Sequence, residues 1–525
     1  MPTLINWNKE IKFEVADDQF KTPTQVSDVQ AIVKEAFKQN QKVTVVGAMH
    51  STTECIVGTS TVISMKSMAR VLSVDSEQLT VTVQGGVSLH QLCSHLTKLG
   101  LQLPVILEFG NFQIGAISGT HANDTSMTRG AQFSSFVLGV KLVTPTGDIM
   151  EISETQNVEY LPAIRSHFGM FGVICEVTVR VFKTQSLQVS YQIAQVDSFL
   201  DGFAGELKAL KGAYDQVFGM LFPNTGKLLW QCRKFAEPGT PIPHSWTDPI
   251  ESKGINLFGD LFLPLVKAGT ALHPSAPLAQ LLNAALVDLP LKIIRHSSYT
   301  IDPCDRGIIY SEHNPGFEFY DWVFPEEKWC DMVQAFLQLS DRFRREHDFI
   351  LPLPALVYFV KQDQASLLSR SRNANMIAVD PEYPDPKDPT WKAFRLAFNE
   401  IAVLHGGIPH INKTRDGAIS NFAKVYDPES IRHYLQIRKR FDPKDLFLND
   451  YFKTMFAEYL SESHRPASKR VRDAFDARGS ICLLPCAVFY ISTLHGLYSL
   501  LSLSTIHLTA TYQCKVRKFS PLYEV

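Results

Sequence analysis

A short run of β-branched residues that stops at a glycine is the feature that most constrains how this chain folds. Residues Val43–Val46 read Val-Thr-Val-Val, and Gly47-Ala-Met-His-Ser51 follows directly. Such a run predicts a buried strand, and the glycine after it permits a sharp change of backbone direction. Further along, Gly115-Ala-Ile-Ser-Gly-Thr-His121 is a second stretch of small residues. Small residues let backbone amides approach a ligand closely, so both stretches predict a binding site.

The elements between and after these two stretches follow in a defined order. Leu79–Val87 alternates apolar and polar residues and ends in a Gly-Gly pair, which predicts a strand and a turn. Ser88–Leu99 carries leucines at helical spacing. Phe136–Asp148 predicts a strand running into a turn, and Gly169–Arg180 predicts a glycine turn running into a strand.

In this order, the motifs resemble the FAD-binding half of the vanillyl-alcohol-oxidase type of flavoenzyme, from about Lys21 to Val181. The resemblance implies a two-subdomain PCMH-type FAD-binding domain at residues 1–183. It implies FAD as the cofactor, joined covalently to His50; the alternative is a histidine beside a flavin that is not covalently bound. The residues that the resemblance places at FAD are Gly47, Ala48, Met49, His50, Ser51, Gly85, Gly110, Gly115, Ser118, Gly119, Thr120, His121, Val173 and Ile174.

The charge and cysteine content argue against several other classes of protein. The 525 residues carry a formal net charge of −2 with interspersed charges, so no basic field indicates nucleic-acid binding. Nine cysteines occur without a C-x-x-C pair, which favours reduced thiols and gives no metal-binding pattern. Met1–Asn8 lacks a basic region followed by an apolar core. We therefore expect no signal peptide and an intracellular protein, either cytoplasmic or membrane-associated.

The middle of the chain changes character after about Thr184. Leu187–Ile193 alternates like a strand, Asp197 is placed to cap a helix through Leu210, and Pro223–Gly226 predicts the turn of a hairpin. The proline-rich segment Pro381–Pro389 predicts a loop. These patterns predict an antiparallel sheet with helices on one face, which resembles the substrate, or cap, domain of the same flavoenzymes. The expected fold class is α+β, with the cap domain at residues 184–460.

Two C-terminal motifs narrow the resemblance to one branch of the family. His405-Gly-Gly-Ile-Pro-His-Ile-Asn-Lys413 and Phe441–Phe452 are similar to segments of the sugar-1,4-lactone oxidases and the related alditol oxidases. The resemblance implies that residues 405–455 return to the flavin. We expect Lys413 to place a cation beside the flavin, where it stabilises negative charge on the reduced ring. His410 is expected to orient Lys413 or the substrate, unless it is simply a hydrogen-bonded loop histidine.

The chain departs from that branch on one cap-domain strand. Members carry a Glu-x-Arg pair that holds the substrate alcohol and helps to deprotonate it, and the matching residues are Leu356 and Tyr358. An apolar side chain cannot take a proton. Tyr358 is a candidate acid or base if a nearby cation lowers its pKa. Other candidates for the missing acid are Glu312, His313, Glu318 and Asp321, and the sequence does not choose among them.

The last part of the chain, residues 461–525, is predicted to be a basic linker and an apolar tail. Pro466–Arg472 is basic, and Ile481–Ala510 contains no Asp, Glu, Lys or Arg. A run of this length is sufficient to span a bilayer, so residues 481–508 are a possible membrane partner. Its serines, threonines, histidines and proline favour a disordered extension equally.

Together these observations predict an FAD-dependent oxidoreductase that removes a hydride from a C–OH carbon of a small molecule, with O2 as acceptor. In such an enzyme the flavin performs the redox step and the protein positions the substrate. The resemblance implies a sugar-1,4-lactone oxidase activity. Two alternatives stay open. The first is a flavin oxidoreductase acting on a larger apolar substrate, which the missing Glu-x-Arg pair and the apolar Leu356 favour over a sugar. The second is a catalytically silent flavoprotein.

Overall fold

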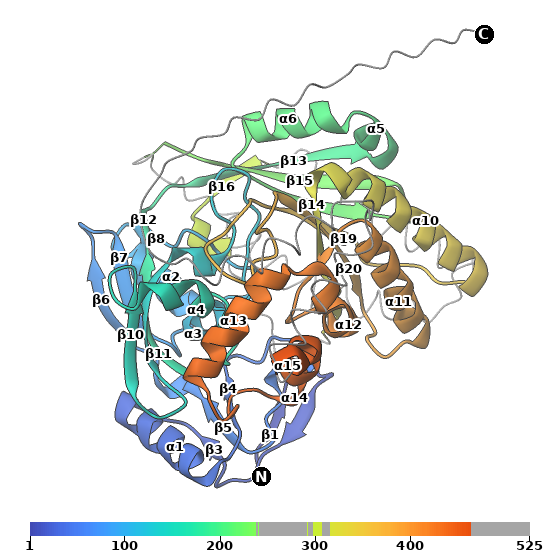
Figure 1. Cartoon of the computed structure of the whole chain (residues 1–525). Helices are drawn as coiled ribbons and strands as arrows, with labels where there is room; N and C mark the ends of the chain where they lie inside the picture. The colour runs from blue at the N-terminus through green and yellow to red at the C-terminus, as the bar shows by residue number, and fades with distance from the viewer. Residues whose placement is uncertain (238–239, 241–290, 292–297, 307–315, 464–525) are drawn as a thin grey trace, which may run out of the picture. The chain divides into compact units, whose positions relative to one another are not determined.

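The structure is a computed structural model that describes residues 1–237, 240, 291, 298–306 and 316–463. Residues 1–461 form one compact unit, whose elements are labelled in Figure 1. The predicted linker and apolar tail at 464–525 lie outside the described residues. The candidate residues Glu312 and His313 also lie outside them.

A small parallel sheet carries the first motif. Its strands are ordered β3 (Phe20–Lys21), β5 (Thr61–Ser64) and β4 (Val43–Val46), which confirms the predicted strand at 43–46. Helix α1 (Val26–Gln39) buries Val29 and Val33 in the same apolar cluster as Val43 and Ile63. The strand β4 therefore sits on a packed layer, and the chain leaves it at Gly47.

A five-stranded antiparallel sheet forms the second subdomain. The order of its strands is β10 (Ile149–Ser153), β9 (Val137–Val143), β11 (Val173–Arg180), β7 (Thr80–Gln84) and β6 (Val71–Asp75). The predicted helix at 88–99 is α2 (Leu89–Thr97), and the hydroxyl of its N-cap Ser88 accepts the Gln91 N–H (3.2 Å). The short helix α3 (Ile114–Ile117) carries the second motif beside β7 and β11. The small parallel sheet and this five-stranded sheet each form the centre of one subdomain, which confirms the predicted two-subdomain architecture.

Among the described residues, the cap sheet has nine strands, and each neighbouring pair is antiparallel. Along its main path the order is β16 (Ser298–Ile301), β13 (Leu187–Gln195), β15 (Lys227–Phe235), β14 (Gln216–Phe222), β19 (Ala355–Val360), β20 (Met376–Tyr383), β18 (Trp322–Pro325) and β21 (Ile408–Pro409), while β17 (Glu318–Phe319) pairs with β20. The predicted hairpin at 223–226 joins β14 to β15.

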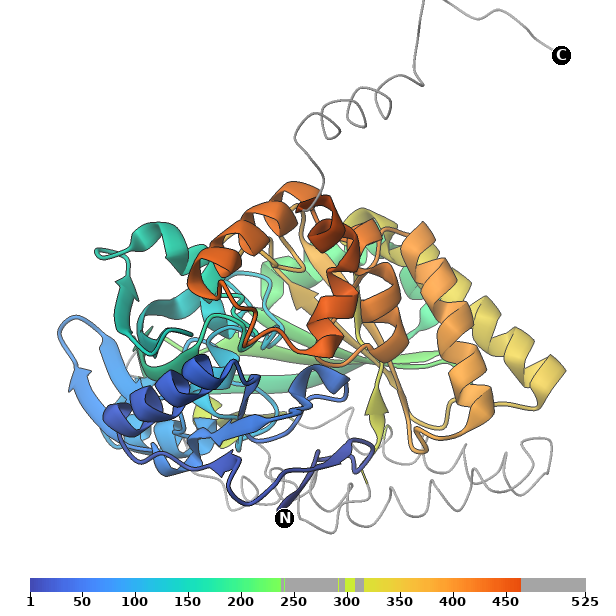
Figure 2. The same ribbon diagram turned by 60° about the horizontal axis from the view of Figure 1, so that its bottom comes forward.

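Helices cover one face of the cap sheet, and the uncovered face points toward the N-terminal domain. The covering helices are α5 (Val196–Asp201), α6 (Phe203–Ala213), α10 (Trp329–His347) and α11 (Pro389–Leu404), the last two lying side by side in Figures 1 and 2. On β14, Val217 and Leu221 belong to the core under these helices. The intervening Phe218 and Met220 line a cavity on the other face, because successive side chains of a strand alternate between faces. The predicted α+β fold is thereby confirmed.

The C-terminal helices return to the N-terminal sheets. They are α12 (Arg415–Val425), α13 (Pro428–Phe441), α14 (Asp450–Met455) and α15 (Ala457–Ser463). The Val43 N–H donates to the Leu446 carbonyl (2.9 Å), and Tyr434 packs edge-on against Phe171 with ring centroids 5.2 Å apart. The exact domain boundaries at 183 and 460 stay a prediction.

Two local predictions are wrong. Asp197 does not cap one long helix, because it lies in the first turn of α5 and Gly202 separates α5 from α6. Residues 381–383 are not a loop but the end of β20. Proline lacks the N–H that a strand interior needs, yet the Pro381 carbonyl still accepts the Tyr320 N–H (3.1 Å) and the strand continues.

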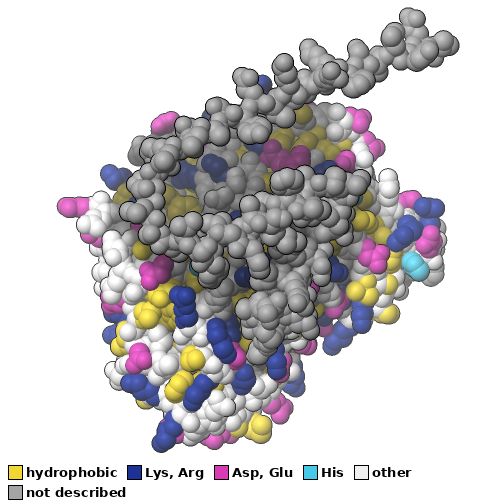
Figure 3. All heavy atoms as spheres, in the orientation of Figure 1, with side chains coloured by type: hydrophobic (Ala, Val, Ile, Leu, Met, Phe, Trp, Pro, Cys, Tyr) yellow, Lys and Arg dark blue, Asp and Glu magenta, His cyan; other side chains and the backbone are white. Residues whose placement is uncertain are grey.

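The charged side chains of the described residues are interspersed on the face shown in Figure 3, with lysines and arginines beside aspartates and glutamates. This agrees with the mixed charge pattern of the sequence. Within the part of the chain that the structure describes, no helix is both long and apolar enough to cross a membrane.

Candidate active site

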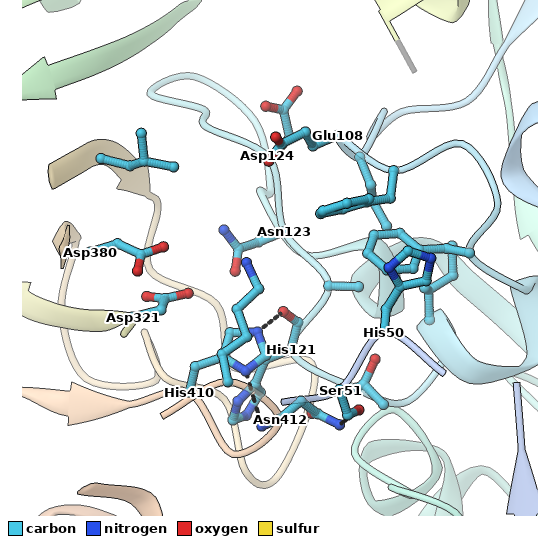
Figure 4. Close-up of a pocket in the computed structure, with 18 of the residues that line it drawn as sticks. His50, Ser51, Glu108, His121, Asn123, Asp124, Asp321, Asp380, His410 and Asn412 are labelled. Carbon is cyan, nitrogen blue, oxygen red and sulfur yellow. Dashed lines mark hydrogen bonds between the residues drawn. The ribbon is translucent and has the colours of Figure 1, made fainter. Parts of the chain in front are cut away.

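A cavity of about 750 Å³ lies between the two N-terminal motifs and the uncovered face of the cap sheet. The first motif contributes Gly47 to Ser51, and the second contributes Gly115 and Thr120–His121. Figure 4 shows His50 on one side of this cavity and the carboxylates of Asp321 and Asp380 on the other. The N-terminal and cap domains thus each supply one wall.

His50 is held by aromatic rings and one hydrogen bond. Its ring lies 4.7 Å from the Phe109 ring and 4.8 Å from the Phe112 ring, centroid to centroid. Its Nε2 is 2.6 Å from Oδ1 of Asn111, so Nε2 carries the proton and donates it to that carbonyl oxygen. Desolvation among the aromatic rings lowers the pKa of His50 to about 4. The ring is therefore neutral, and its buried Nδ1, which has no hydrogen-bond partner, keeps a free lone pair.

The glycines between the motifs allow backbones to pack closely below the cavity. A Cβ atom on Gly85 would lie 2.5 Å from the Ile174 carbonyl oxygen, and one on Gly115 would lie 2.9 Å from the Gly85 carbonyl oxygen. Larger residues would push these segments apart. The glycine-lined wall allows a flat ring to lie close to the backbone, and the free ring nitrogen of His50 is available to bond it. The residues present therefore fit FAD.

The structure places most of the predicted cofactor-binding residues on the cavity wall. Those that line it are Gly47, Ala48, Met49, His50, Ser51, Gly85, Gly115, Thr120, His121 and Ile174. Gly110, Ser118, Gly119 and Val173 are not among the lining residues. Ser118 instead donates its hydroxyl to the Gly115 carbonyl (2.8 Å), and Gly119 packs under the His167 ring. Their positions give them a supporting role behind the wall.

The segment that ends at Lys413 is bonded directly to the first motif. The Thr52 N–H donates to the Asn412 carbonyl (2.8 Å), and the Thr52 hydroxyl donates to the Lys413 carbonyl (2.9 Å). The Asn412 side-chain amide donates to the Ser51 hydroxyl (3.1 Å). These bonds hold Lys413 in the cavity, where its ammonium group lies 4.2 Å above the centre of the Phe319 ring.

His410 lines the cavity, but both of its ring nitrogens are occupied. Nδ1 accepts the Asn412 N–H (3.1 Å), so the proton is on Nε2, which donates to the His121 carbonyl (2.8 Å). Burial, followed by the charge of Arg370, lowers its pKa well below the usual value. This neutral, fully bonded histidine joins the Lys413 segment to the second motif and acts as a positioning residue.

Leu356 and Tyr358 face the cavity from β19, as the strand register requires. Arg370 donates to the Tyr358 hydroxyl oxygen (3.3 Å). Tyr358 is a candidate acid or base only if a cation lowers its pKa. Burial instead raises the pKa of Tyr358 well above its usual value, although Arg370 lies beside it. Tyr358 is a neutral phenol and serves as a hydrogen-bonding group.

Asp321 is the candidate acid that reaches the cavity. Its Oδ1 accepts a hydrogen bond from Arg370 (2.8 Å), and the two side chains are 1% and 0% exposed. Burial would raise the pKa of Asp321, but Arg370 and then Lys413 outweigh that effect and hold it below the usual value. Glu318 does not reach the cavity, because it is bonded to Arg395 (3.3 Å) and Arg415 (2.7 Å) elsewhere.

Sequence reasoning missed two carboxylates on β20 and the buried guanidinium. Asp380 and Glu382 both line the cavity, but they fall where the prolines predicted a loop edge. Arg370 also donates to the Asn123 side-chain carbonyl (2.7 Å), so it ties the second motif to the cap domain. No short motif surrounds Arg370, and the apolar run Met-Ile-Ala-Val at 376–379 is the one local signal of a strand that leads to Asp380 and Glu382.

Comparisons with known proteins agree with this site. The family profile described as "FAD binding domain" matches residues 18–153, and the profile described as "D-arabinono-1,4-lactone oxidase" matches residues 308–455. The chain is 27% identical to L-gulonolactone oxidase of Mus musculus, over 86% of this chain and 97% of that protein. It is 25% identical to L-gulono-1,4-lactone dehydrogenase of Mycobacterium tuberculosis, over 82% and 94%.

A solved structure shares the fold. Cholesterol oxidase from B. sterolicum superposes with a TM-score of 0.70 at 14% sequence identity, covering 86% of this chain and 96% of that one. Among the described residues, no cluster of three or more His, Cys, Asp or Glu side chains is placed to hold a metal ion. With the FAD-type wall, the cap sheet and both profile matches, this chain is an FAD-dependent oxidoreductase that is similar to the sugar-1,4-lactone oxidases.

Proposed function

We propose that this enzyme oxidises a hydroxyl group of a sugar lactone to a carbonyl group and passes the electrons to O2. The observation that carries the proposal is the two-sided cavity. Its N-terminal wall fits FAD at His50, and its cap wall presents a cluster of ionisable groups at Asp321, Asp380 and Lys413. Bound FAD supplies the acceptor for the hydride that leaves the substrate carbon. The matches to lactone oxidases and dehydrogenases favour this reaction over the two alternatives.

Polar side chains on the cavity wall support a substrate that carries several hydroxyl groups. Asp124 is bonded by Arg306 (3.0 Å) and Arg233 (3.3 Å) on the cavity wall, and Gln231 accepts from Arg233 (2.8 Å). Tyr191 and Tyr299 face the same space with hydroxyl oxygens 3.1 Å apart. A polyhydroxylated ring needs such donors and acceptors, because buried polar groups without partners are costly.

The free Nδ1 of His50 supports covalent attachment of FAD at that atom. Attachment exchanges a C–H bond of the cofactor for a C–N bond to Nδ1, so a proton and two electrons must leave. O2, the acceptor in the proposed reaction, takes those electrons. The neutral ring, protonated on Nε2, keeps the Nδ1 lone pair available for this bond.

Lys413 supports the same reaction as the cation near the cofactor. Its half-buried ammonium group lies in the cavity on a segment bonded to the first motif, and it bears no hydrogen bond to the acids across the cavity within the described contacts. A fixed positive charge stabilises the negative charge that develops on a reduced ring. The His410 and Asn412 bonds keep this charge in place.

Peroxide production tests the proposal. Air-saturated holoenzyme is mixed with L-gulono-1,4-lactone, D-arabinono-1,4-lactone, a polyol or an apolar cyclic alcohol. We expect peroxide in equal amount to the oxidised lactone, and slower release with the apolar alcohol. Peroxide from the apolar alcohol but from neither lactone would favour the larger apolar substrate instead. No peroxide and no flavin reduction with any of them would favour a silent flavoprotein.

A further inference from the structure

Two carboxylates project from β20 into the cavity. Asp380 and Glu382 are two residues apart on one strand, so they share a face, and both line the cavity. Asp380 lies directly opposite Leu356 in the register of β19 and β20. The uncovered face of the cap sheet therefore carries acids on β20, beside the apolar Leu356 and the phenol of Tyr358 on β19.

Asp380 has no hydrogen-bond partner although it is buried. Its side chain is 1% exposed, and neither carboxylate oxygen is bonded. The Tyr320 N–H, which lies near this carboxyl group, donates to the Pro381 carbonyl instead (3.1 Å). Buried polar groups are nearly always bonded, so an unbonded carboxylate on a cavity wall calls for an explanation. A substrate hydroxyl is the partner that would satisfy it.

Charged and titratable groups surround Asp380 on several elements. They are Glu382 on its own strand, Tyr358 on β19, Asp321 before β18, Arg370 in the 361–375 connection and Lys413 after β21. Asp321 is already committed to Arg370 by an ion pair of 2.8 Å. Of the two acids Asp321 and Asp380, Asp321 therefore ionises first. Asp380 is the acid that can still exchange a proton.

The environment separates the two acids in the way that acid–base chemistry requires. Burial, and then the negative charge of Asp321, raise the pKa of Asp380 well above its usual value. Arg370 and Lys413 hold the pKa of Asp321 below its usual value despite burial. Neighbouring carboxylates whose pKa values are pushed apart are a recurring arrangement of catalytic sites. A raised pKa also brings a carboxylate closer to the pH at which a general base is most effective.

We propose that Asp380 is the general base that accepts the proton of the substrate hydroxyl group. This inference rests on the proposed lactone oxidation. As the C–H hydride leaves for FAD, the O–H bond breaks, its proton goes to a carboxylate oxygen of Asp380, and the C=O bond forms. Asp321 keeps its charge through the step because Arg370 holds it. Other groups at the cavity are less suited: His410 has both nitrogens bonded, and Tyr358 is a neutral phenol.

Flavin reduction in the absence of O2 tests the assignment. The holoenzyme is mixed with L-gulono-1,4-lactone in a stopped-flow instrument, at a series of pH values, as wild type, Asp380→Asn and Glu382→Gln. We expect the limiting reduction rate of Asp380→Asn to fall by about 10²–10⁴-fold, with a smaller change in the lactone dissociation constant. The wild-type rate should rise with pH through an acidic limb. That limb should vanish in Asp380→Asn and persist in Glu382→Gln.

Chemical rescue separates a base from a structural group. Added formate should restore part of the reduction rate of Asp380→Ala in a concentration-dependent way, and should not accelerate Glu382→Gln. If formate does not accelerate Asp380→Ala, or if the acidic limb is lost only in Glu382→Gln, the assignment is overturned. If wild type is reduced by no lactone, the proposed function fails instead. If the Asp380 variants retain no flavin, the wild-type profile decides, and a reduction rate without an acidic limb rejects the base.

A second readout does not depend on activity. Between its unfolded-state pKa and its folded-state pKa, a carboxyl group whose pKa is raised by folding holds its proton in the folded protein and releases it on unfolding. Its contribution to stability is therefore fully present below the unfolded pKa and is lost as pH rises through the folded pKa. We expect Asp380→Asn to gain stability relative to wild type as pH is raised above about 4. A pH-independent difference would show that folding does not raise the pKa of Asp380 and would contradict the environment on which the inference rests.

Discussion

Leu356 on β19 and Asp380 on β20 lie directly opposite each other, and both side chains line the cavity. Directly opposed residues on one face of an antiparallel sheet have Cβ atoms about 4.5–5.5 Å apart. A carboxylate on β20 therefore reaches nearly the same part of the cavity as one at position 356 would. The acid that the family resemblance places on β19 is replaced here by one on the adjacent strand.

Covalent attachment of FAD predicts a specific peptide. We expect digestion and mass spectrometry of the holoenzyme to find the flavin on the peptide containing His50, because its Nδ1 is unbonded and its ring is neutral. His50→Ala should release its flavin in acid. His90→Ala, at an exposed position on α2, should keep it. A wild-type flavin that is fully released by acid would rule out the attachment.

Lys413 is expected to act on the reduction step. Lys413→Ala should slow flavin reduction by about 10²-fold or more, as expected when one preorganised charge is lost from a catalytic site. The flavin spectrum and circular dichroism should stay near wild type, and Lys413→Arg should recover part of the rate. Lys453→Ala, exposed on α14, is the matched control and should reduce at the wild-type rate. An unchanged rate in Lys413→Ala would return this lysine to a structural role.

The Asp321–Arg370 ion pair is expected to be a large contributor to stability. Removing one partner leaves an uncompensated buried charge, so Asp321→Ala should lower the free energy of unfolding by about 3–5 kcal/mol. The pKa of Asp321 is lowered in the folded state, so its contribution is present above the unfolded pKa and is lost as pH falls. Asp341→Ala removes an exposed ion pair with Arg344 on α10 and should change stability little. Chemical denaturation measures both, and equal effects would contradict the ranking.

The close backbone approach at Gly85 makes this position sensitive. Gly85→Ala should reduce flavin content and stability, because the added Cβ would lie 2.5 Å from the Ile174 carbonyl oxygen. Gly212→Ala on α6 meets no atom within 4 Å. It should stabilise the protein by about 0.5–1 kcal/mol, since glycine weakens a helix relative to alanine. Full flavin occupancy in Gly85→Ala would show that the segments have room to separate.

Local patterns sufficed for much of the fold and for one wall of the site. The β-branched run at 43–46, the leucine spacing at 88–99 and the turn at 223–226 each reflect interactions within a few residues, and each predicted element is present. His50 and Lys413 were found because short motifs surround them. The predicted cavity-lining residues of the two motifs were found in the same way.

The other wall depends on pairings that no local pattern encodes. Arg370 meets Asp321 across 49 residues and Asn123 across 247 residues. Asp380 was hidden because Pro381 and the prolines after it suggested a loop, whereas the strand tolerates a proline whose carbonyl is still bonded. The sequence of one strand shows that Leu356 stands where an acid was expected. The proposed replacement, Asp380, lies on the neighbouring strand, and only the register of β19 and β20 places it opposite Leu356.

The most direct test of the account is an anaerobic titration of the holoenzyme with L-gulono-1,4-lactone, followed by the visible absorbance of the flavin. We expect the absorbance to bleach to completion with about one lactone per flavin, since the flavin accepts two electrons from one C–OH group. It should return when O2 is admitted, with release of peroxide. A flavin that is bleached by dithionite but left oxidised by an excess of lactone would contradict the proposed function.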